Sequence, residues 1–203
     1  MFPGDSSNLV LTGFMGTGKT AAGREIARRL GRHFVDMDAE IEARTGRSIP
    51  DIFREGEAGF RHLEAGLCRE LAARQGLVIA TGGGALLNAD SREILAASGP
   101  VVCLRAAPDE IRRRLEGGAG RPLLAGDAAN EIPRLLAERE AAYARIPLQV
   151  EGSGLSVDEV AGRVLALVSG HVPDPAILPV AGEGQGYAIR LGPGLLPRAG
   201  ALL

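Results

Sequence analysis

A glycine-rich octet near the start of the chain sets the strongest limit on its fold. Its sequence is Gly13-Phe14-Met15-Gly16-Thr17-Gly18-Lys19-Thr20, which fits the pattern G-x-x-x-x-G-K-[ST]. The apolar run 8–12 before it is typical of a buried strand, and the segment 18–30 after it carries apolar residues four apart, as a helix does. A strand, a glycine turn and a helix N-terminus in succession form a phosphate-binding loop. The octet therefore predicts an α/β protein that binds a nucleoside triphosphate, and a glycine-rich turn without a ligand is the alternative.

Lys19 is the only lysine among the 23 Lys and Arg residues of the chain. An ammonium is a compact point charge that fits against β- and γ-phosphate oxygens, whereas a guanidinium is a broad planar fork. The lysine therefore favours a phosphate contact at this position, and the hydroxyl of Thr20 is suited to ligate Mg²⁺. The residues expected to contact the nucleotide here are Gly13, Met15, Gly16, Thr17, Gly18, Lys19, Thr20 and Ala21.

Composition narrows the class of protein. The chain has 203 residues, of which 45% are apolar and 3% aromatic, with a formal net charge of −2. That length suits one α/β domain with a short extra segment, and the charge gives no sign of a nucleic-acid or membrane partner. Residues 1–8 lack a signal-peptide pattern and no apolar run approaches a membrane span, so we expect a cytoplasmic protein, and its small size favours a monomer. Cys68 and Cys103 are expected to be buried free thiols, and no Cys/His set has zinc-ligand spacing.

Strand-like runs alternate with helical segments, which predicts a mostly parallel sheet wrapped by helices. The strands are expected at 8–12, 33–37, 77–81, 100–104 and 148–151. The helices are expected at 18–30, 38–45, 48–55, 57–74, 90–98, 107–116, 128–145 and 157–168. The glycine-rich segment 117–122 is expected to be a mobile loop. After Gly170 the chain becomes rich in Pro and Gly with one apparent strand at 187–191, so we expect a domain at 1–170 and a separate tail at 171–203.

Two carboxylates at the end of the second strand are candidates for chemistry. Asp36 and Asp38 are two apart, so in a strand they point to the same face, and the carboxyl ends of parallel strands open onto the ligand crevice. One carboxylate is suited to hold Mg²⁺ through water, and the other to accept a proton or hydrogen bond from a substrate hydroxyl. For Asp38 the alternative is a simple N-cap of the following helix.

Two further features suggest a second substrate. Arg61 and Glu64 are three apart on a helix whose apolar stripe is expected to be Phe60, Leu63, Leu67 and Leu71. They are either an exposed ion pair or an arginine aimed at an anionic substrate and oriented by its glutamate. Gly82, Gly83 and Gly84 directly follow a predicted strand, where bare backbone lets a substrate approach closely. A flexible turn is the alternative for this triplet.

Together these motifs resemble shikimate kinase over about residues 8–170. The resemblance rests on their order and spacing, and its members are the loop 13–20, Asp36-Met37-Asp38, the segments 41–42, 44–49 and 51–53, Phe60-Arg61 with Glu64, Gly82 to Gly84, 121–124, and Arg139 with Tyr143. It implies a P-loop NTPase fold of the nucleoside-monophosphate-kinase type. In that fold a five-stranded parallel sheet has helices on both faces and a mobile lid. The implied reaction is transfer of phosphate from ATP to the 3-hydroxyl of shikimate, on the route to chorismate and the aromatic amino acids.

The resemblance also implies roles for single residues. Arg61 and Arg139 correspond to the clamp for the shikimate carboxylate, beside Gly82 to Gly84, and Asp38 to the residue that prepares the 3-hydroxyl. Lys19, Arg121 of the lid and Mg²⁺ held by Thr20 and Asp36 would neutralise charge on the transferred group. Arg114 corresponds to an arginine that packs on adenine, although it could equally be a solvated member of the run 112–114. The segment 151–153 departs from the family, which puts the base contacts in doubt.

Other functions stay open at this level. A kinase of the same fold for another polyol acid, such as gluconate, is one alternative, and a nucleotide-binding module without catalysis is another. The tail carries a separate likeness, because the run 187–196 resembles the opening strand and turn of 3-dehydroquinate synthase. Residues 171–203 are expected to be an incomplete start of such a domain, loosely packed or disordered, with no synthase activity, and an ordinary Pro/Gly-rich tail is the alternative.

Overall fold

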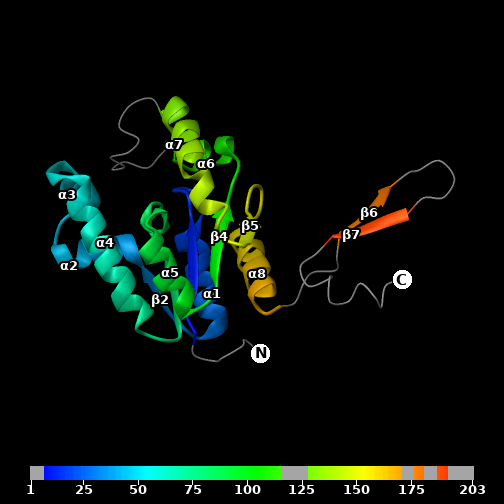
Figure 1. The fold of residues 1–203 in the computed structure, drawn as a ribbon, viewed down its shortest axis with the longest axis horizontal. Coiled ribbons are helices and arrows are strands. Elements are labelled where there is room, and N and C mark those ends of the chain that lie inside the picture. The colour runs from blue at the N-terminus through cyan, green and yellow to red at the C-terminus, as the bar shows by residue number, and fades with distance from the viewer. Residues whose placement is uncertain (1–6, 116–127, 171–175, 181–186, 192–203) are drawn as a thin grey trace.

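The computed structural model describes residues 7–115, 128–170, 176–180 and 187–191 (Figure 1). Its centre is a parallel sheet with the strand order β2-β3-β1-β4-β5. The strands are β1 Leu9–Gly13, β2 His33–Asp36, β3 Leu77–Ala80, β4 Val101–Arg105 and β5 Leu148–Glu151. Each lies within two residues of its predicted range. The predicted five-stranded parallel sheet is therefore confirmed.

Helices cover both faces of this sheet, as Figure 1 shows. Their bounds are α1 Lys19–Leu30, α2 Met37–Thr45, α3 Ile49–Glu55, α4 Glu57–Ala72, α5 Ala89–Ser98, α6 Pro108–Leu115, α7 Ala128–Tyr143 and α8 Val157–Val168. A short 3₁₀ turn, η1 at Ala85–Leu87, was not predicted. Three residues make one such turn, which is too short to leave a periodic signal in the sequence.

The central strand divides the interior into two cores. Side chains alternate along a strand, so Leu9 and Leu11 face one side of β1 and Val10 faces the other. The core around Leu9 and Leu11 is closed by α1 and α8, while α2 to α7 supply the core around Val10. All five residues of β1 are buried, which accounts for its nearly unbroken apolar sequence.

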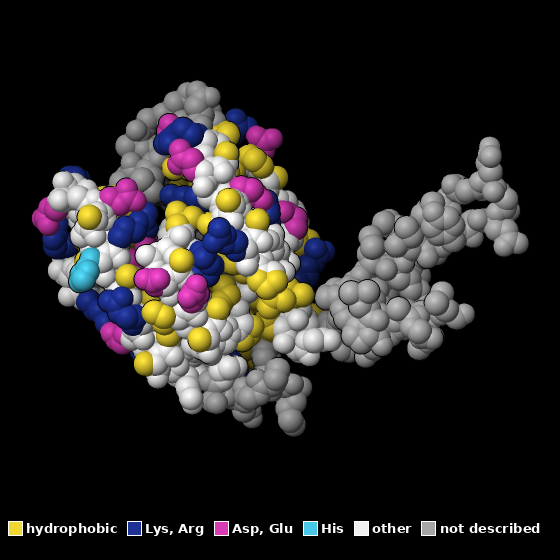
Figure 2. Space-filling view, viewed as in Figure 1, with side chains coloured by type: hydrophobic (Ala, Val, Ile, Leu, Met, Phe, Trp, Pro, Cys, Tyr) yellow, Lys and Arg dark blue, Asp and Glu magenta, His cyan; other side chains and the backbone are white. Residues whose placement is uncertain are grey.

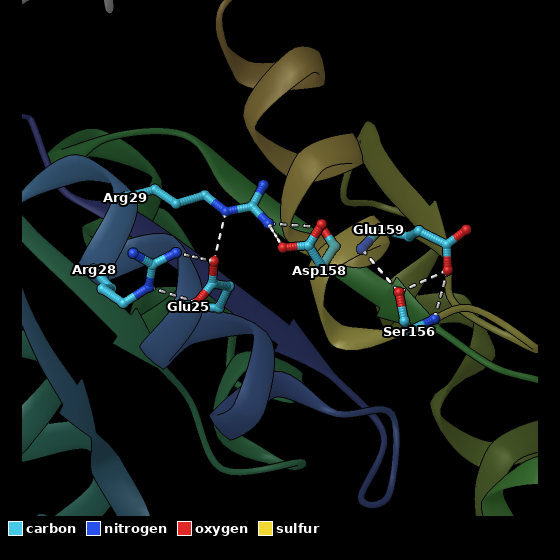
Figure 3. A network of polar contacts seen from close by, with 6 residues as sticks. All are labelled: Glu25, Arg28, Arg29, Ser156, Asp158 and Glu159. Carbon is cyan, nitrogen blue, oxygen red and sulfur yellow. Dashed lines mark hydrogen bonds and ion pairs between the residues drawn. The ribbon is translucent and has the colours of Figure 1, made fainter.

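Helices α1 and α8 are also joined by the polar network in Figure 3. Glu25 accepts hydrogen bonds from Arg28 and Arg29, and these arginines hold the pKa of its carboxyl at about 2. Arg29 continues to α8, where it donates to the carbonyl and the carboxylate of Asp158. The start of α8 carries a capping box between Ser156 and Glu159. This network fixes the first turn of α8 beside the helix that follows the phosphate loop.

Figure 2 shows acidic and basic side chains interspersed on one face of the molecule rather than gathered by sign. Many charged side chains of the described residues form ion pairs within a helix, such as Arg134 with Glu138 and Arg113 with Glu110. No helix in the described ranges is long and apolar enough to cross a membrane. Cys68 and Cys103 are buried free thiols as predicted, and burial raises the pKa of each to about 11.

Two predictions about helix faces and strands were wrong. On α4, Phe60, Leu67 and Leu71 of the predicted stripe are buried, but Leu63 is 38% exposed and its neighbour Glu64 is only 3% exposed. Apolar spacing alone favoured Leu63 as the buried residue, and only the site described below explains the burial of Glu64.

In the tail, a second strand that was not predicted, β6 Ala176–Val180, pairs antiparallel with β7 Tyr187–Leu191. Pro179 lies within β6, and in a two-stranded sheet every strand is an edge, where proline is tolerated. The predicted lid at 117–122 lies outside the described residues.

Asn8 ties three elements of the fold together. Its side chain is 1% exposed. It donates to the carbonyls of Leu71 and Arg74 at 3.1 and 2.9 Å and accepts from the N–H of Leu77 at 3.0 Å. The end of α4 and the start of β3 are thereby fastened to the start of β1, so a single amide satisfies three backbone groups.

Replacing Asn8 by Ala should therefore lower the free energy of unfolding by about 2–4 kcal/mol, because buried donors and acceptors would lose their partners. Urea titration followed by circular dichroism measures this change. Asn88→Ala is the matched control, since Asn88 caps α5 through one bond to Ser91 and its loss should cost only about 1 kcal/mol. Equal losses in the two variants would contradict the role of Asn8.

Candidate active site

The phosphate loop is folded around positions that only glycine satisfies. Gly13 has φ +132°, and a Cβ there would lie 2.1 Å from the carbonyl oxygen of Leu104 on the neighbouring strand. Gly18 has φ +92° and forms the left-handed N-cap of α1. Lys19, the first residue of α1, folds back so that Nζ donates to the carbonyls of Gly13 and Phe14 at 3.0 and 2.9 Å. The predicted strand, glycine turn and helix N-terminus are therefore confirmed, with the ammonium held over the loop.

The two candidate carboxylates occupy different positions from those predicted. Asp36 is the last residue of β2 and caps α2, with its Oδ1 accepting from the N–H groups of Asp38 and Ala39. Asp38 lies in the first turn of α2, so the argument from strand alternation was wrong, and the capping residue is Asp36 rather than Asp38. The prediction failed because strand β2 ends one residue earlier than expected, and a side chain that satisfies helix N–H groups ends it there.

Both carboxylates nevertheless face the phosphate loop. The Oδ2 of Asp36 accepts a hydrogen bond from the hydroxyl of Thr20 at 2.6 Å. A cavity of about 260 Å³ lies between the loop, α2 and β3, and it is lined by Met15, Gly16, Gly18, Lys19, Thr20, Ala21, Asp36, Asp38, Thr81 and Gly83. Thr81 was not singled out from the sequence, and its hydroxyl bonds that of Thr12 on β1 at 3.1 Å. A single cavity is therefore lined both by the cationic phosphate loop and by two carboxylates.

A second set of charges lies beside the glycine triplet. Arg61 on α4 donates from Nη1 to Oε2 of Glu64 at 2.7 Å. This pair is not a surface ion pair, since the side chain of Glu64 is 4% exposed and that of Arg61 29%. The guanidinium also lies over the rings of Phe60 and Phe53, at 5.3 and 5.9 Å from their centres. Glu64 and these rings therefore restrain Arg61 before any ligand arrives.

The absence of side chains at the triplet leaves room for these groups. A Cβ on Gly84 would lie 2.5 Å from Nη1 of Arg61. A Cβ on Gly82 would lie 2.6 Å from Oε1 of Glu64 and 2.8 Å from Oδ1 of Asp38. The triplet is thus not a generic flexible turn, because two of its members make space for the charged groups of α2 and α4.

Helix α7 brings the remaining predicted arginine to the same place. Arg139 is 5% exposed, lies 5.3 Å over the ring of Phe14 and donates to the carbonyl of Gly83 at 3.4 Å. Tyr143, one turn later, donates to the same carbonyl at 2.7 Å. Burial raises the pKa of Tyr143 to about 12, so its hydroxyl stays a donor at neutral pH. Arg61 and Arg139 therefore converge on neighbouring glycines from two different helices.

The electrostatics of this region centre on Glu64. Burial raises the pKa of its carboxyl, Arg61 opposes that shift, and the nearby charge of Asp38 adds to it. Its Oε1 is buried and has no hydrogen-bond partner among the described residues. Buried polar atoms are normally paired, so this oxygen is suited to accept from a hydroxyl or water brought by a ligand.

Arg114 lies between the phosphate loop and the loop after β5. Its guanidinium donates to the carbonyl of Gly16 at 3.3 Å and to that of Gly152 at 3.4 Å, and it pairs with Glu110. Arg114 therefore links the phosphate loop to the loop after β5 and is not a fully solvated member of the run 112–114. The unusual segment 151–153 is closed by Glu151, which accepts from the Ser153 hydroxyl at 2.6 Å. Arg121 lies outside the described residues.

Within the described part of the chain, no group of three His, Cys, Asp or Glu side chains is arranged to hold a metal ion. Magnesium bound together with a nucleotide does not need such a group, because phosphate oxygens and water complete its shell. The hydroxyl of Thr20 in the first turn of α1 and the carboxylate of Asp36 at the end of β2 are hydrogen-bonded to each other, and their oxygens fit that requirement.

A phosphate loop that shares a cavity with a carboxylate, beside two converging arginines, defines a small P-loop kinase for an anionic acceptor. The sequence pattern of the shikimate kinase family matches residues 15–169. The chain belongs to the shikimate kinase family, as the resemblance predicted.

Individual relatives agree with this assignment. The shikimate kinase of Pelotomaculum thermopropionicum is 44% identical over 166 residues, which cover 81% of this chain and 96% of that protein. A structure of shikimate kinase from Acinetobacter baumannii in complex with shikimate has a TM-score of 0.78 and 39% identity, covering 81% of this chain and 94% of the other. A gluconokinase from Sinorhizobium meliloti, with a TM-score of 0.55 and 17% identity over 81% and 93% of the two chains, shares the fold alone.

The position of Arg114 leads to a test of the nucleotide site. Arg114→Gln should weaken ADP binding about tenfold, measured by calorimetry, because the side chain that joins the phosphate loop to the base loop is shortened and uncharged. Arg113→Gln is the matched control, since Arg113 is 72% exposed and pairs only with Glu110 among the described contacts. Similar ADP affinities in the two variants would contradict the assigned role.

Proposed function

We propose that the protein transfers the γ-phosphoryl group of ATP to the 3-hydroxyl of shikimate. The observation that carries this proposal is the convergence of Arg61 and Arg139 on Gly83 and Gly84, beside the cavity that holds Lys19 and Asp38. Two guanidinium groups suit a single carboxylate, which each can bind with two parallel hydrogen bonds. Shikimate has one carboxylate and three hydroxyls, so an acceptor fixed at its carboxylate would present hydroxyls toward Asp38.

The acceptor side would act by positioning and by taking a proton. With the carboxylate held by the two arginines, Asp38 accepts the proton of the attacking hydroxyl. The unpaired Oε1 of Glu64, near Asp38 across Gly82, is placed to accept a hydrogen bond from a neighbouring hydroxyl or a water. Phosphoryl transfer asks a protein mainly for such alignment and for neutralisation of charge.

The donor side would supply that neutralisation. Lys19 leaves the carbonyls of Gly13 and Phe14 to contact phosphate oxygens, and the N-terminus of α1 points at the same position. Thr20 would ligate Mg²⁺ directly and Asp36 through water, and the ion would balance the charge of the β- and γ-phosphates. Arg121, by its likeness to the family, is proposed to add a further positive charge.

Gluconate is the alternative acceptor, and it too carries one carboxylate. The gluconokinase structure shares the fold at low identity, so it favours neither acceptor. Arg61, paired with the buried Glu64, and Arg139 form a preset site for a carboxylate next to bare backbone, which suits a compact ring better than a flexible chain.

A coupled assay for ADP release tests the proposal directly. The chain with MgATP should phosphorylate shikimate and should leave gluconate unreacted. Lys19→Ala should lose about 10²–10³-fold in kcat, since a group that contacts the transition state is removed. Turnover of gluconate but not shikimate would establish the alternative acceptor, and nucleotide binding without turnover of either would indicate a non-catalytic module.

The boundary after Gly170 is likewise a proposal. We infer that residues 171–203 take no part in catalysis, supported by the position of every site residue before that point. A chain ending at Gly170 should keep its kcat for shikimate within about twofold, because the two-stranded β6–β7 sheet is too small to form a core of its own. A large loss of kcat or melting temperature on truncation would show that the tail belongs to the kinase.

Gly84 offers a sharper test of the carboxylate site. Its φ of −111° suits alanine, so Gly84→Ala would act only through the methyl group that collides with Arg61. The shikimate KM should rise about tenfold or more while the ATP KM stays unchanged. Gly59→Ala on α4 is the control, because a Cβ there meets nothing within 4 Å. Equal shikimate KM values in both variants would refute the placement of Arg61 at the acceptor.

A further inference from the structure

Arg61 is engaged by a second carboxylate that sequence reasoning did not single out. Glu57, the first residue of α4, uses Oε1 to accept from Nε of Arg61 at 3.2 Å and from Nη2 at 2.9 Å. The side chain of Glu57 is 56% exposed. An exposed ion pair of this kind adds little to stability, so the contact calls for another explanation.

The donors of Arg61 can be counted. A guanidinium has five N–H groups. Within the described part of the chain, Glu57 takes one from Nε and one from Nη2, and Glu64 takes one from Nη1. One N–H then remains on each of the two terminal nitrogens, and each is available to an oxygen of an acceptor carboxylate. These two nitrogens are the atoms that a Cβ on Gly84 would strike.

From this count we infer that Glu57 is a positioning residue for the acceptor carboxylate. By holding the Nε–Nη2 edge it fixes the rotation of the guanidinium, so the two remaining N–H groups are presented at Gly84. Glu64 alone contacts one terminal nitrogen and leaves the group free to turn about that contact. The rings of Phe53 and Phe60 limit tilt of the plane but not rotation within it.

Competition between Glu57 and the substrate for Arg61 predicts the opposite change in the shikimate KM. Glu57 and Glu64 bring two negative charges to Arg61, so Glu57 could instead compete with the substrate carboxylate. Its removal would then lower the shikimate KM. The sign of the change therefore separates positioning from competition.

The inference rests on the proposed function, and the kinetic test uses the full chain with shikimate and MgATP. Glu57→Ala should raise the shikimate KM about tenfold and leave kcat and the ATP KM within about twofold, because only the orientation of Arg61 is affected. Glu57→Gln should show a smaller rise, since its amide oxygen still accepts from Nε and Nη2.

Glu55→Ala is the matched control. Glu55 is 70% exposed, lies two residues away and pairs with Arg47 at 2.6 Å, so its loss should leave the shikimate KM unchanged. An unchanged or lowered shikimate KM in Glu57→Ala would overturn the positioning role. Failure of the unmodified chain to phosphorylate shikimate would instead overturn the proposed function, so the two failures are distinguishable.

Discussion

The close approach of Gly13 to the carbonyl of Leu104 is the constraint on which the site depends. A side chain at Gly13 would collide with that carbonyl, so only glycine can occupy this position. From Gly13 the backbone leaves β1 at the edge of the sheet and leads into the N-terminus of α1. Lys19 then folds over that turn. Because the five strands are parallel and β1 is central, the ends of β2 and β3 open at the same edge. Every group assigned to catalysis in the described residues gathers around this single turn.

The second organising element is the burial of charge beside the glycine triplet. Taking the carboxylate of Glu64 out of water is costly, and the loss of Arg61 would leave that buried charge uncompensated. Such a pair is therefore poor evidence for stability but a good device for orientation. Arg61, Arg139 and Tyr143 all meet the chain at Gly83 or Gly84, where no side chain keeps them apart. Among the described residues, the charges beside the triplet are held by packing against one another and against the glycine backbone.

Some details show where sequence patterns are misleading. The stripe of α4 suggested Leu63 as a core residue, yet the fold buries Glu64 and exposes Leu63. Likewise, the spacing of Asp36 and Asp38 suggested one strand face, although the chain turns into α2 between them. In both cases a polar side chain takes a position for a reason that lies in another element. Glu64 accepts a hydrogen bond from Arg61 and lies against the glycine triplet. Asp36 accepts hydrogen bonds from the N–H groups of α2 and from the hydroxyl of Thr20.

The sequence by itself determined the sheet, the order of helices, the phosphate loop and the family, because these depend on local periodicity and on motifs of adjacent residues. Arg61, Arg139 and Asp38 could be named from the sequence through their likeness to the family. Only the tertiary structure decided that Arg61 and Arg139 meet at Gly83 and Gly84, that Arg114 bridges Gly16 and Gly152, and that Glu57 completes the hold on Arg61. Those contacts join residues of separate helices, strands and loops or depend on the rotamer of a long side chain. Their geometry is fixed by packing in three dimensions, for which a linear pattern carries no signal.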